Sequence, residues 1–424
     1  MSLDVDTQSL VGIRRDLHEH PEPGWCEFRT TAVIAERLRR LGFEVHVGPD
    51  AVELTGEERF PGEETIDRRA ERAIEEGVDS DLVDRLRAGG TGVVGVLERG
   101  DGPVVGLRTD IDALDIHEAE DEDHRPAREG FRSEHAGESH ACGHDGHAAI
   151  GLGVAETVAA DESFDGTLKL LFQPGEEGWG GGRAMAASGH LDDVDSLLAV
   201  HLGLDLPTGT VVTGADFLTV SGFEVEFSGT SAHSAAAPHE GKNALLAAST
   251  AVQNLYAIPR HSDGETRINV GTLEAGTASN VVPGSATMSV ESRGRTDELC
   301  AYVEDRMESA LRGAAESHGV DVSITKRGTT ISADHDPAVA GRIADAIADV
   351  EGVTDVRTHL AVPGSEDACY LIERVREHGG DGTYLLVGAD LASGHHTPRF
   401  DFDENALGIA VRTLSRALAA EAAG

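Results

Sequence analysis

The densest group of chemically active side chains is the stretch His140-Ala-Cys142-Gly-His144-Asp145-Gly-His147. Its imidazole, thiol and carboxylate groups are the ligands that proteins offer to zinc-type and manganese-type ions. A Cys-x-His spacing on a loop lets Cys142 and His144 converge on one site. Because the chain contains 20 histidines, a chance cluster at a helix N-terminus, with Asp145 as an anion in the first turn, is the alternative reading. Together with the groups described next, the stretch predicts a metal site.

A second group follows an apolar strand, where Leu170–Phe172 leads through Gln-Pro-Gly to Glu176 and Glu177. Active sites of open α/β sheets form beyond the carboxyl ends of strands. In extended backbone, neighbouring side chains point to opposite sides, so one glutamate can bind a metal while the other faces the attacking water. The alternative is a solvated acidic turn. Residues 180–182 are glycines, but they do not predict a phosphate loop, because no Gly-Lys-Ser/Thr sequence follows.

Three weaker signals also lie at or after strand ends. They are His201 after Ala-Val, the pair His395-His396 before Thr-Pro, and the carboxylates Asp110 and Asp112. None is specific alone, and a lone His201 is better read as a core or surface histidine. Together they place possible ligands on several strand ends of one sheet.

Short apolar strands alternate with helical segments along much of the chain, which is the pattern of an α/β layer. The strands are predicted at Val93–Leu97, Val104–Leu107, Leu168–Phe172, Leu197–Val200 and Tyr384–Val387, and the helices near Thr30–Leu41, Ala148–Ala160 and Ala406–Ala420.

A different pattern, with alternating strands, runs from about Phe223 to Lys326, and it predicts a ferredoxin-like α+β unit. Its strands are predicted at Phe223–Phe227, Ile268–Leu273, Ala286–Glu291 and Val320–Thr325, with helices at Asn243–Tyr256 and Asp297–His318. We therefore expect a catalytic domain of residues 1–216 and 328–424 with a second domain inserted at 217–327. Residues 51–90, rich in Glu, Asp and Arg, are expected to form a helical surface insertion or a mobile loop.

The composition indicates the solvent rather than the chemistry. The 424 residues include 76 Asp and Glu but only 35 Lys and Arg, which gives a formal net charge of −41. Such a field repels nucleic acid and anionic membrane surfaces. The cations are almost all arginine and aromatic residues make up 4%, which suggests a halophilic protein that works in concentrated salt, where charge repulsion is screened. An ordinary acidic bacterial enzyme is the alternative.

The N-terminus, the apolar runs and the cysteines indicate the cellular compartment of the protein. The N-terminus shows no basic, then apolar, signal-peptide pattern, and no apolar run approaches the length of a membrane span. The 4 cysteines are scattered and predict no disulfide framework. We expect a cytoplasmic protein without membrane or nucleic-acid partners.

Taken together, the segments resemble the dimetal aminoacylase/carboxypeptidase-type amidohydrolases, and within them the aminobenzoyl-glutamate branch. The likeness covers essentially the whole chain. The motifs that carry it are Gly24-Trp-Cys-Glu-Phe-Arg-Thr30, the insertion at 51–90, Arg108-Thr-Asp-Ile-Asp-Ala-Leu-Asp115, the Cys142 cluster, Pro363-Gly-Ser-Glu-Asp367, Gly394-His-His396 and Phe400-Asp-Phe-Asp-Glu404. The chain departs from the wider family at Asp115, where proline is usual, and at Gly175, where alanine is usual.

The resemblance implies a mixed-sheet catalytic domain of the zinc-peptidase type with an inserted ferredoxin-like dimerisation or lid domain. It also implies two divalent ions per subunit, either zinc or manganese. Cys142 resembles the ligand that bridges the two ions, and His144 and Glu177 complete one side. His201 and His396 resemble the remaining ligands, since His396 stands directly before Thr-Pro.

The resemblance assigns further roles. Glu176 resembles the general base, and Asp110 a carboxylate that orients ligands. In the inserted domain, His233 resembles a histidine that reaches the active site of the partner chain and polarises the scissile carbonyl. Asn280 and Arg293 resemble groups that hold the carboxylate of the substrate, although Arg293 also fits a strand-end surface charge.

The implied reaction is hydrolysis of the amide between an acyl or aroyl group and an amino acid, with aminobenzoyl-glutamate or a related N-acyl amino acid as substrate. One alternative is another specificity, such as an aminoacylase, an N-acetyl-amino-acid deacetylase or a dipeptidase. A second is an inactive metal-binding partner subunit. The role of His233 requires a second chain, so we expect a homodimer or a heteromer with a paralogous B-type subunit.

Overall fold

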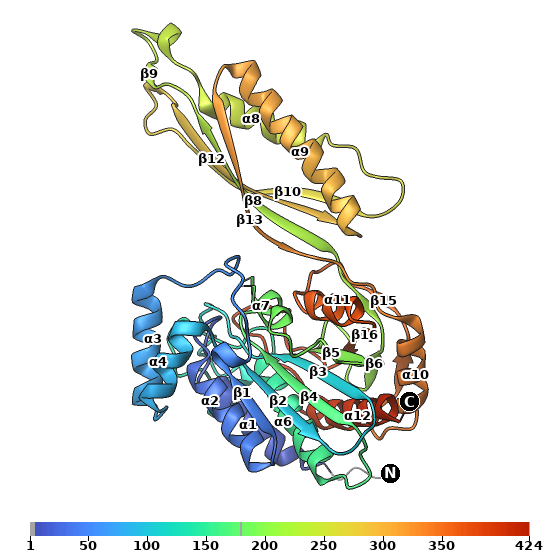
Figure 1. Ribbon diagram of the computed structural model, residues 1–424. Coiled ribbons are helices and arrows are strands. Elements are labelled where there is room, and N and C mark those ends of the chain that lie inside the picture. Colours follow the sequence, from blue (N-terminus) through green and yellow to red (C-terminus); the bar gives the residue numbers. More distant parts are fainter. Residues whose placement is uncertain (1–4, 179, 424) are drawn as a thin grey trace. The chain divides into compact units, whose positions relative to one another are not determined.

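The computed structural model describes residues 5–178 and 180–423. The chain divides into two compact units (Figure 1). Unit 1 comprises Met1–Asp216, Ala333–Ala361 and Asp367–Gly424, and unit 2 comprises Phe217–Ser332 and Val362–Glu366. None of the helices in the described part of the chain is long and apolar enough to span a membrane.

Unit 1 is built on an eight-stranded mixed sheet in the order β1-β2-β4-β3-β5-β16-β6-β14. The central strands β4, β3, β5 and β16 are parallel to one another. On one side β2 runs antiparallel to β4 and β1 antiparallel to β2, and on the other side β6 runs antiparallel to β16. The strands are β1 Glu44–Val47, β2 Val93–Glu98, β3 Val104–Asp110, β4 Thr167–Gln173, β5 Ser196–Leu202, β6 Thr210–Val212, β14 Asp355–Arg357 and β16 Asp381–Val387. A separate parallel pair joins β7 (Ala215–Asp216) to β15 (Leu360–Ala361).

Helices cover both faces of this sheet, which explains why the central strands are almost continuously apolar and buried (Figure 1). The layer on one face consists of α1 (Thr7–Glu19), α2 (Phe28–Arg40), α6 (His144–Ala160) and α12 (Asn405–Ala422), and the other face carries α7 (Gly181–Ala187) and α11 (Cys369–Glu377). Two further helices are α5 (Arg125–Glu129) and α10 (Pro337–Ile347). The predicted α/β class with a mixed sheet is confirmed.

Residues 51–90 contain two helices, α3 (Glu63–Glu75) and α4 (Ser80–Gly89), joined by a short turn. Their apolar faces form a small core of their own with Cys26 and Phe28. Arg69 of α3 is buried, donates to Glu138 at 2.9 Å and forms an ion pair with Asp115. The acidic residue at 115, where the family usually has proline, is therefore used to bind this helical insertion.

Unit 2 has the chain order β8-α8-β10-β12-α9-β13 and an antiparallel sheet in the order β10-β12-β8-β13, which is the ferredoxin-like arrangement. Both helices lie on the same face of the sheet (Figure 1). The elements are β8 Thr219–Ser228, α8 Ala244–Tyr256, β10 Thr266–Ala275, β12 Ser285–Gly294, α9 Asp297–His318 and β13 Asp321–Thr330, with a small ladder between β9 (Ala232–His233) and β11 (Val281–Val282). The predicted ferredoxin-like unit is confirmed.

Candidate active site

The carboxyl ends of the parallel strands assemble the site in unit 1. Asp110 is the last residue of β3, His201 stands directly before the last residue of β5, and the chain leaves β4 towards the two glutamates. Because these strands are parallel neighbours, their ends meet at one edge of the sheet. The α6 helix begins at the same place, with Gly143 as its N-cap in the left-handed region (φ 89°).

Three groups of potential ligand atoms lie at this edge, each with all its atoms within 4.8 Å of one another. They are Cys142 with His144 and Glu177, Cys142 with His201 and His395, and His144 with His147 and His201. Cys142 is buried, its Sγ lies 3.5 Å from Nε2 of His201, and it belongs to two of the groups. A side chain shared in this way is suited to bridge two ions.

The ring nitrogens of His144 and His201 are oriented for binding a cation. Nδ1 of His201 donates to the Leu202 carbonyl at 2.7 Å, so Nε2 presents its lone pair to the site. Nδ1 of His144 faces Oδ1 of Asp112 at 3.1 Å, and its buried Nε2 makes no hydrogen bond. The buried Nε2 of His395 likewise makes none. Buried nitrogens without partners fit ligands of a metal ion, and the N, O and S donors suit zinc or manganese.

The electrostatics of the site also favour a cation. Burial lowers the pKa of His144, but the carboxylates of Asp110 and Asp112 outweigh it and raise that pKa to about 10. Burial raises the pKa of Asp110, but the neighbouring His144, His147 and Arg108 hold it well below its usual range. Burial and the neighbouring His147 hold the pKa of His201 well below its usual range, which favours the neutral form that binds a metal. At His144, whose pKa is raised, binding of an ion would release a proton.

The two adjacent histidines near the C-terminus have different surroundings. Nε2 of His396 lies 3.0 Å from Oε1 of Glu177, and the residue has a left-handed backbone (φ 59°) and a half-exposed side chain. His395, which is not among the predicted ligands, is grouped with Cys142 and His201. Spacing in the sequence cannot decide which of two consecutive histidines turns towards a site, because a left-handed residue changes the direction of the chain.

His147 is also absent from the predicted ligands, and its contacts hold neighbouring elements of the site together. Its Nδ1 forms a hydrogen bond with Oδ1 of Asp110, and its Nε2 accepts from the backbone N–H of Leu202 at 2.8 Å. With both ring nitrogens engaged, His147 connects α6 to β5 and β3. Asp110 completes this link through Arg108, whose Nη1 donates to its Oδ2 at 2.8 Å.

Asp112 contacts two predicted ligands at once. Its Oδ1 faces Nδ1 of His144 at 3.1 Å, and its Oδ2 accepts from the backbone N–H of Glu177 at 3.0 Å. Asp110, predicted as the orienting carboxylate, lies 3.7 Å from Nε2 of His144 and bonds His147 instead. Both carboxylates stand in the same sequence motif and both contact α6, but the motif alone cannot show that Asp112 faces His144 and Asp110 faces His147.

We expect Asp112→Asn to weaken metal binding by about 10- to 100-fold, because an amide orients His144 less strongly and does not raise the basicity of its ring. Metal content after dialysis against graded chelator measures the effect. The exposed Asp101→Asn variant is the control. Equal metal retention by Asp112→Asn and Asp101→Asn would contradict the role given to Asp112.

The glutamate pair lies in a turn and not in extended backbone, so the expectation that alternation separates the two side chains was wrong. Gly175 has φ 56°, a left-handed conformation that favours glycine, and its N–H donates to Oε1 of buried Glu27 at 2.8 Å. This explains why glycine replaces the usual alanine. The turn that carries Glu176 and Glu177 is thus anchored on Glu27.

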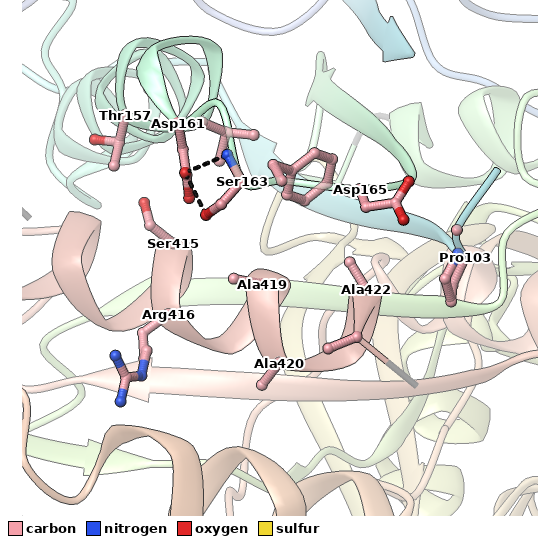
Figure 2. Close-up of a pocket in the computed structure, with 14 residues that line it drawn as sticks. Pro103, Thr157, Asp161, Ser163, Asp165, Ser415, Arg416, Ala419, Ala420 and Ala422 are labelled. Atoms are coloured by element: carbon pink, nitrogen blue, oxygen red, sulfur yellow. Dashed lines mark hydrogen bonds between the residues drawn. The ribbon is translucent and has the colours of Figure 1, made fainter. Parts of the chain in front are cut away.

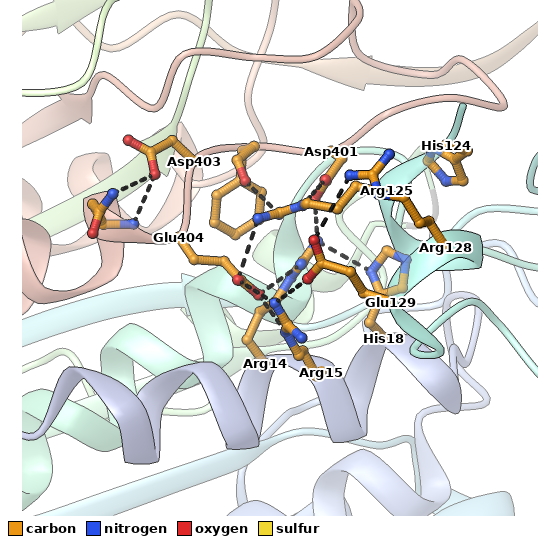
Figure 3. Close-up of polar contacts among 12 residues, drawn as sticks. Arg14, Arg15, His18, His124, Arg125, Arg128, Glu129, Asp401, Asp403 and Glu404 are labelled. Atoms are coloured by element: carbon orange, nitrogen blue, oxygen red, sulfur yellow. Dashed lines mark hydrogen bonds and ion pairs between the residues drawn. The ribbon is translucent and has the colours of Figure 1, made fainter. Parts of the chain in front are cut away.

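A network of ion pairs joins α1 to the segment before α12 (Figure 3). Arg14 of α1 is fully buried and donates to Asp145 at 2.8 Å, to Asp401 at 2.9 Å and to Glu404 at 3.1 Å. Asp145 directly follows His144 in the first turn of α6. The network therefore fixes the start of α6 against α1 and the segment that leads into α12.

His18 extends this network between Asp145 (2.8 Å) and Glu118 (2.9 Å). Burial and Arg14 lower its pKa, but the two carboxylates outweigh them and raise it from 6.5 to about 9. Because the folded state favours the protonated form of His18, this residue contributes its full stabilisation below pH 6.5, and the contribution is lost as the pH rises through 9.

We expect wild type to lose up to about 3 kcal/mol of unfolding free energy between pH 6.5 and pH 9 relative to the His18→Gln variant, measured by denaturant titration. Parallel pH profiles of the two proteins would contradict this.

In unit 2, His233 and Asn280 are neighbours. Nδ1 of His233 accepts from the backbone N–H groups of Ala235 (3.2 Å) and Ala236 (3.1 Å), which places the ring proton on Nε2. The carbonyl of Asn280 accepts from the Ser234 N–H at 3.0 Å. His233 thus presents an N–H donor, the group needed to polarise a carbonyl oxygen.

Arg293 lies elsewhere in unit 2. It is near the end of β12, where it donates to Glu291 at 2.6 Å and to the Pro363 carbonyl at 2.9 Å. Asn280 precedes the start of β12 at Ser285, so the length of the strand, about 25 Å, separates the two predicted carboxylate-binding residues.

The cavity in Figure 2 is a different place in unit 1. Its volume is about 590 Å³, and it lies between the end of α6, the segment 161–165 and α12. Among the lining residues that the structure describes there is no histidine or cysteine, and Asp161 bonds its neighbour Ser163. This cavity carries none of the predicted chemistry.

Comparisons with known proteins agree with the geometry. Residues 106–420 match the model of Peptidase family M20/M25/M40. The chain is 45% identical to one of the subunits of p-aminobenzoyl-glutamate hydrolase from Escherichia coli (strain K12), over 95% of this chain and 93% of that protein. It is 43% identical to the indole-3-acetyl-aspartic acid hydrolase of Enterobacter agglomerans, again over 95% and 93%.

Solved structures show the same fold. An aminobenzoyl-glutamate utilization protein from Klebsiella pneumoniae superposes with a TM-score of 0.80 at 37% identity, covering 97% of this chain and 96% of that one. A dinuclear metal-binding peptidase of the M20 family from Bacillus subtilis gives 0.73 at 26% identity, with 97% of each chain covered. Because the matches extend over nearly the whole chain, the assignment is plain: the chain belongs to the peptidase family M20/M25/M40 and is a hydrolase that acts on amide bonds.

Proposed function

We propose that the protein is a dimetal amidohydrolase that releases an acidic amino acid from an N-aroyl or N-acyl conjugate, with p-aminobenzoyl-glutamate as the first candidate. The observation that carries the proposal is Cys142, whose thiol belongs to two groups of ligand atoms beside the Glu176 turn. The two named relatives act on a glutamate and an aspartate conjugate.

Cys142, His144 and Glu177 would hold one side of the metal centre, and His201, His396 and the neighbouring His395 the other. Two divalent ions bound there supply Lewis acidity to the scissile carbonyl and to the attacking water. Cysteine favours zinc, whereas the imidazole and carboxylate groups suit either zinc or manganese.

The protein's own groups move the protons. Glu176 accepts a proton from the attacking water and returns it to the amine that leaves. The Nε2 proton of His233 is the donor proposed for the carbonyl oxygen as negative charge develops on it. Arg293 and Asn280 are proposed to bind the carboxylate of the substrate, and a guanidinium matches a carboxylate through two parallel hydrogen bonds.

A dimer through unit 2 is part of the proposal. Since β12 separates Arg293 from Asn280 and His233 by about 25 Å, one unit 2 cannot supply all three to one small substrate, whereas two copies can. Large apolar side chains are exposed on this unit, which supports an interface there: Leu245, Leu246, Tyr256 and Leu273. The partner is a second copy or, as the name of the E. coli relative implies for that protein, a different subunit.

The proposed compartment is the cytoplasm. All four cysteines lie in the described part of the chain and none forms a disulfide, as is usual in a reducing compartment. The proposed solvent is concentrated salt, because salt screens the repulsion within a chain of formal charge −41.

A panel of substrates tests the specificity of the purified chain in molar salt. It contains p-aminobenzoyl-glutamate, indole-3-acetyl-aspartate, N-acetyl amino acids with neutral side chains, and dipeptides. We expect the highest kcat/KM for one of the two acidic conjugates. Preference for a neutral N-acetyl amino acid or a dipeptide would favour the aminoacylase or dipeptidase alternative. Activity only after a second, different polypeptide is added would favour the partner-subunit alternative.

A further inference from the structure

A second group of metal-type ligands lies in unit 1, formed by residues that the proposed catalysis does not use. We infer that Asp216, His335 and His359 form a binding site for one divalent cation of the zinc class. Their potential ligand atoms all lie within 4.8 Å of one another. Two imidazoles and a carboxylate are a set of protein ligands that zinc accepts, with water completing the coordination.

The two imidazoles converge on the same carboxylate from different segments. Nδ1 of His335 lies 2.6 Å from Oδ1 of Asp216, and Nε2 of His359 lies 2.9 Å from Oδ2. The two rings are also neighbours, with centroids 5.2 Å apart. The cluster therefore presents two nitrogens and two oxygens in one small volume.

The backbone is built to hold this arrangement. Gly214 lies against the ring of His335, and a Cβ there would be 2.4 Å from the ring and 2.6 Å from the Thr358 carbonyl. The carbonyl of Gly214 also accepts from the Leu360 N–H at 2.9 Å, within the parallel pairing of β7 with β15. The absence of a side chain at 214 thus lets the three segments approach closely.

The three side chains differ in exposure, so that the cluster is both held in place by packing and reachable from solvent. Asp216 and His335 are 8% and 11% exposed, so they are positioned by packing, whereas His359 is 55% exposed and leaves the cluster open to solvent. An ion can enter from the side of His359 without movement of the core. The strongly negative chain also concentrates cations near its surface.

The place of the site in the chain indicates its role. Asp216 is the last residue of unit 1 before unit 2 begins, His335 follows the return at Ala333, and His359 precedes the next departure after Ala361. One ion would therefore join, within unit 1, three segments at whose ends the chain passes between the units. Its expected effect is structural: it stabilises these segments and takes no part in hydrolysis.

Zinc itself is the probe in the test. The enzyme with its active-site metals is dialysed against buffered micromolar Zn²⁺, and bound zinc per chain is measured by atomic emission. We expect His359→Ala and His335→Ala each to bind one equivalent less than wild type while aminobenzoyl-glutamate hydrolysis by His359→Ala is unchanged. The control is His378→Ala, a surface histidine of unit 1 whose Nδ1 bonds the Arg374 carbonyl.

Two outcomes would overturn the inference. Equal zinc content in wild type and His359→Ala would show that the three residues are only a hydrogen-bonded cluster. Loss of more than one equivalent, or of hydrolysis, in His359→Ala would show that the site is not separate from the catalytic one. Because zinc content is measured independently, the inference can fail while the proposed function stands, and the reverse is equally visible.

Discussion

Glu176→Gln is expected to lower kcat by about 10²- to 10⁴-fold while the protein keeps its metal. The amide has the shape of the carboxylate but cannot accept the proton of the attacking water. The turn should survive, because the hydrogen bonds from the Gly175 N–H to Glu27 and from the Gly181 N–H to the Gly175 carbonyl remain in the variant. Single-turnover hydrolysis and metal content are the two measurements.

The neighbouring Glu177→Gln variant is the matched control. Glu177 is grouped with Cys142 and His144, so its loss should lower metal content as well as turnover. The two adjacent substitutions thus separate the base from the ligand. Retained turnover in Glu176→Gln, or metal loss equal to that of Glu177→Gln, would refute the assignment of the base.

His233→Ala is expected to inactivate the enzyme, and its combination with Glu176→Gln reveals whether a site is shared between chains. Two chains with different tags are co-expressed, one carrying Glu176→Gln and the other His233→Ala, and the mixed dimers are isolated. If His233 acts on the partner's site, one site keeps both residues, and about half of the wild-type activity per dimer is expected.

The control is a mixed dimer in which both substitutions lie in the same chain. A wild-type chain paired with a chain that carries both substitutions has no complete shared site, so it should be inactive. If His233 acts within its own chain, the pattern inverts: the first dimer is inactive and the second is half active. The two dimers contain the same substitutions, so differences in stability do not explain opposite results.

Much of the fold could be predicted because its signals are local. The central strands of unit 1 are apolar runs, and the structure extends each by only a few residues, as for β5 at Ser196–Leu202. In unit 2 the alternation of apolar and polar residues marks the strands, and α9 at Asp297–His318 matches its prediction.

The finer features of the site could not be predicted, because they depend on backbone direction and tertiary contacts. The helix α6 begins at His144 rather than Ala148, since Gly143 in the left-handed region serves as its N-cap. The use of Asp112 depends on contacts with residues far away in sequence. The cluster of Asp216, His335 and His359 joins positions up to 143 residues apart, a distance over which spacing carries no signal.

The most direct test of the central claim is hydrolysis of p-aminobenzoyl-glutamate by the purified chain, stripped of metal and then given two equivalents of Zn²⁺ or Mn²⁺ in molar salt. We expect equal release of aminobenzoate and glutamate that begins only after the metal is added and is lost in Glu176→Gln. Metal-independent release, or no release with any member of the substrate panel, would contradict the proposed function.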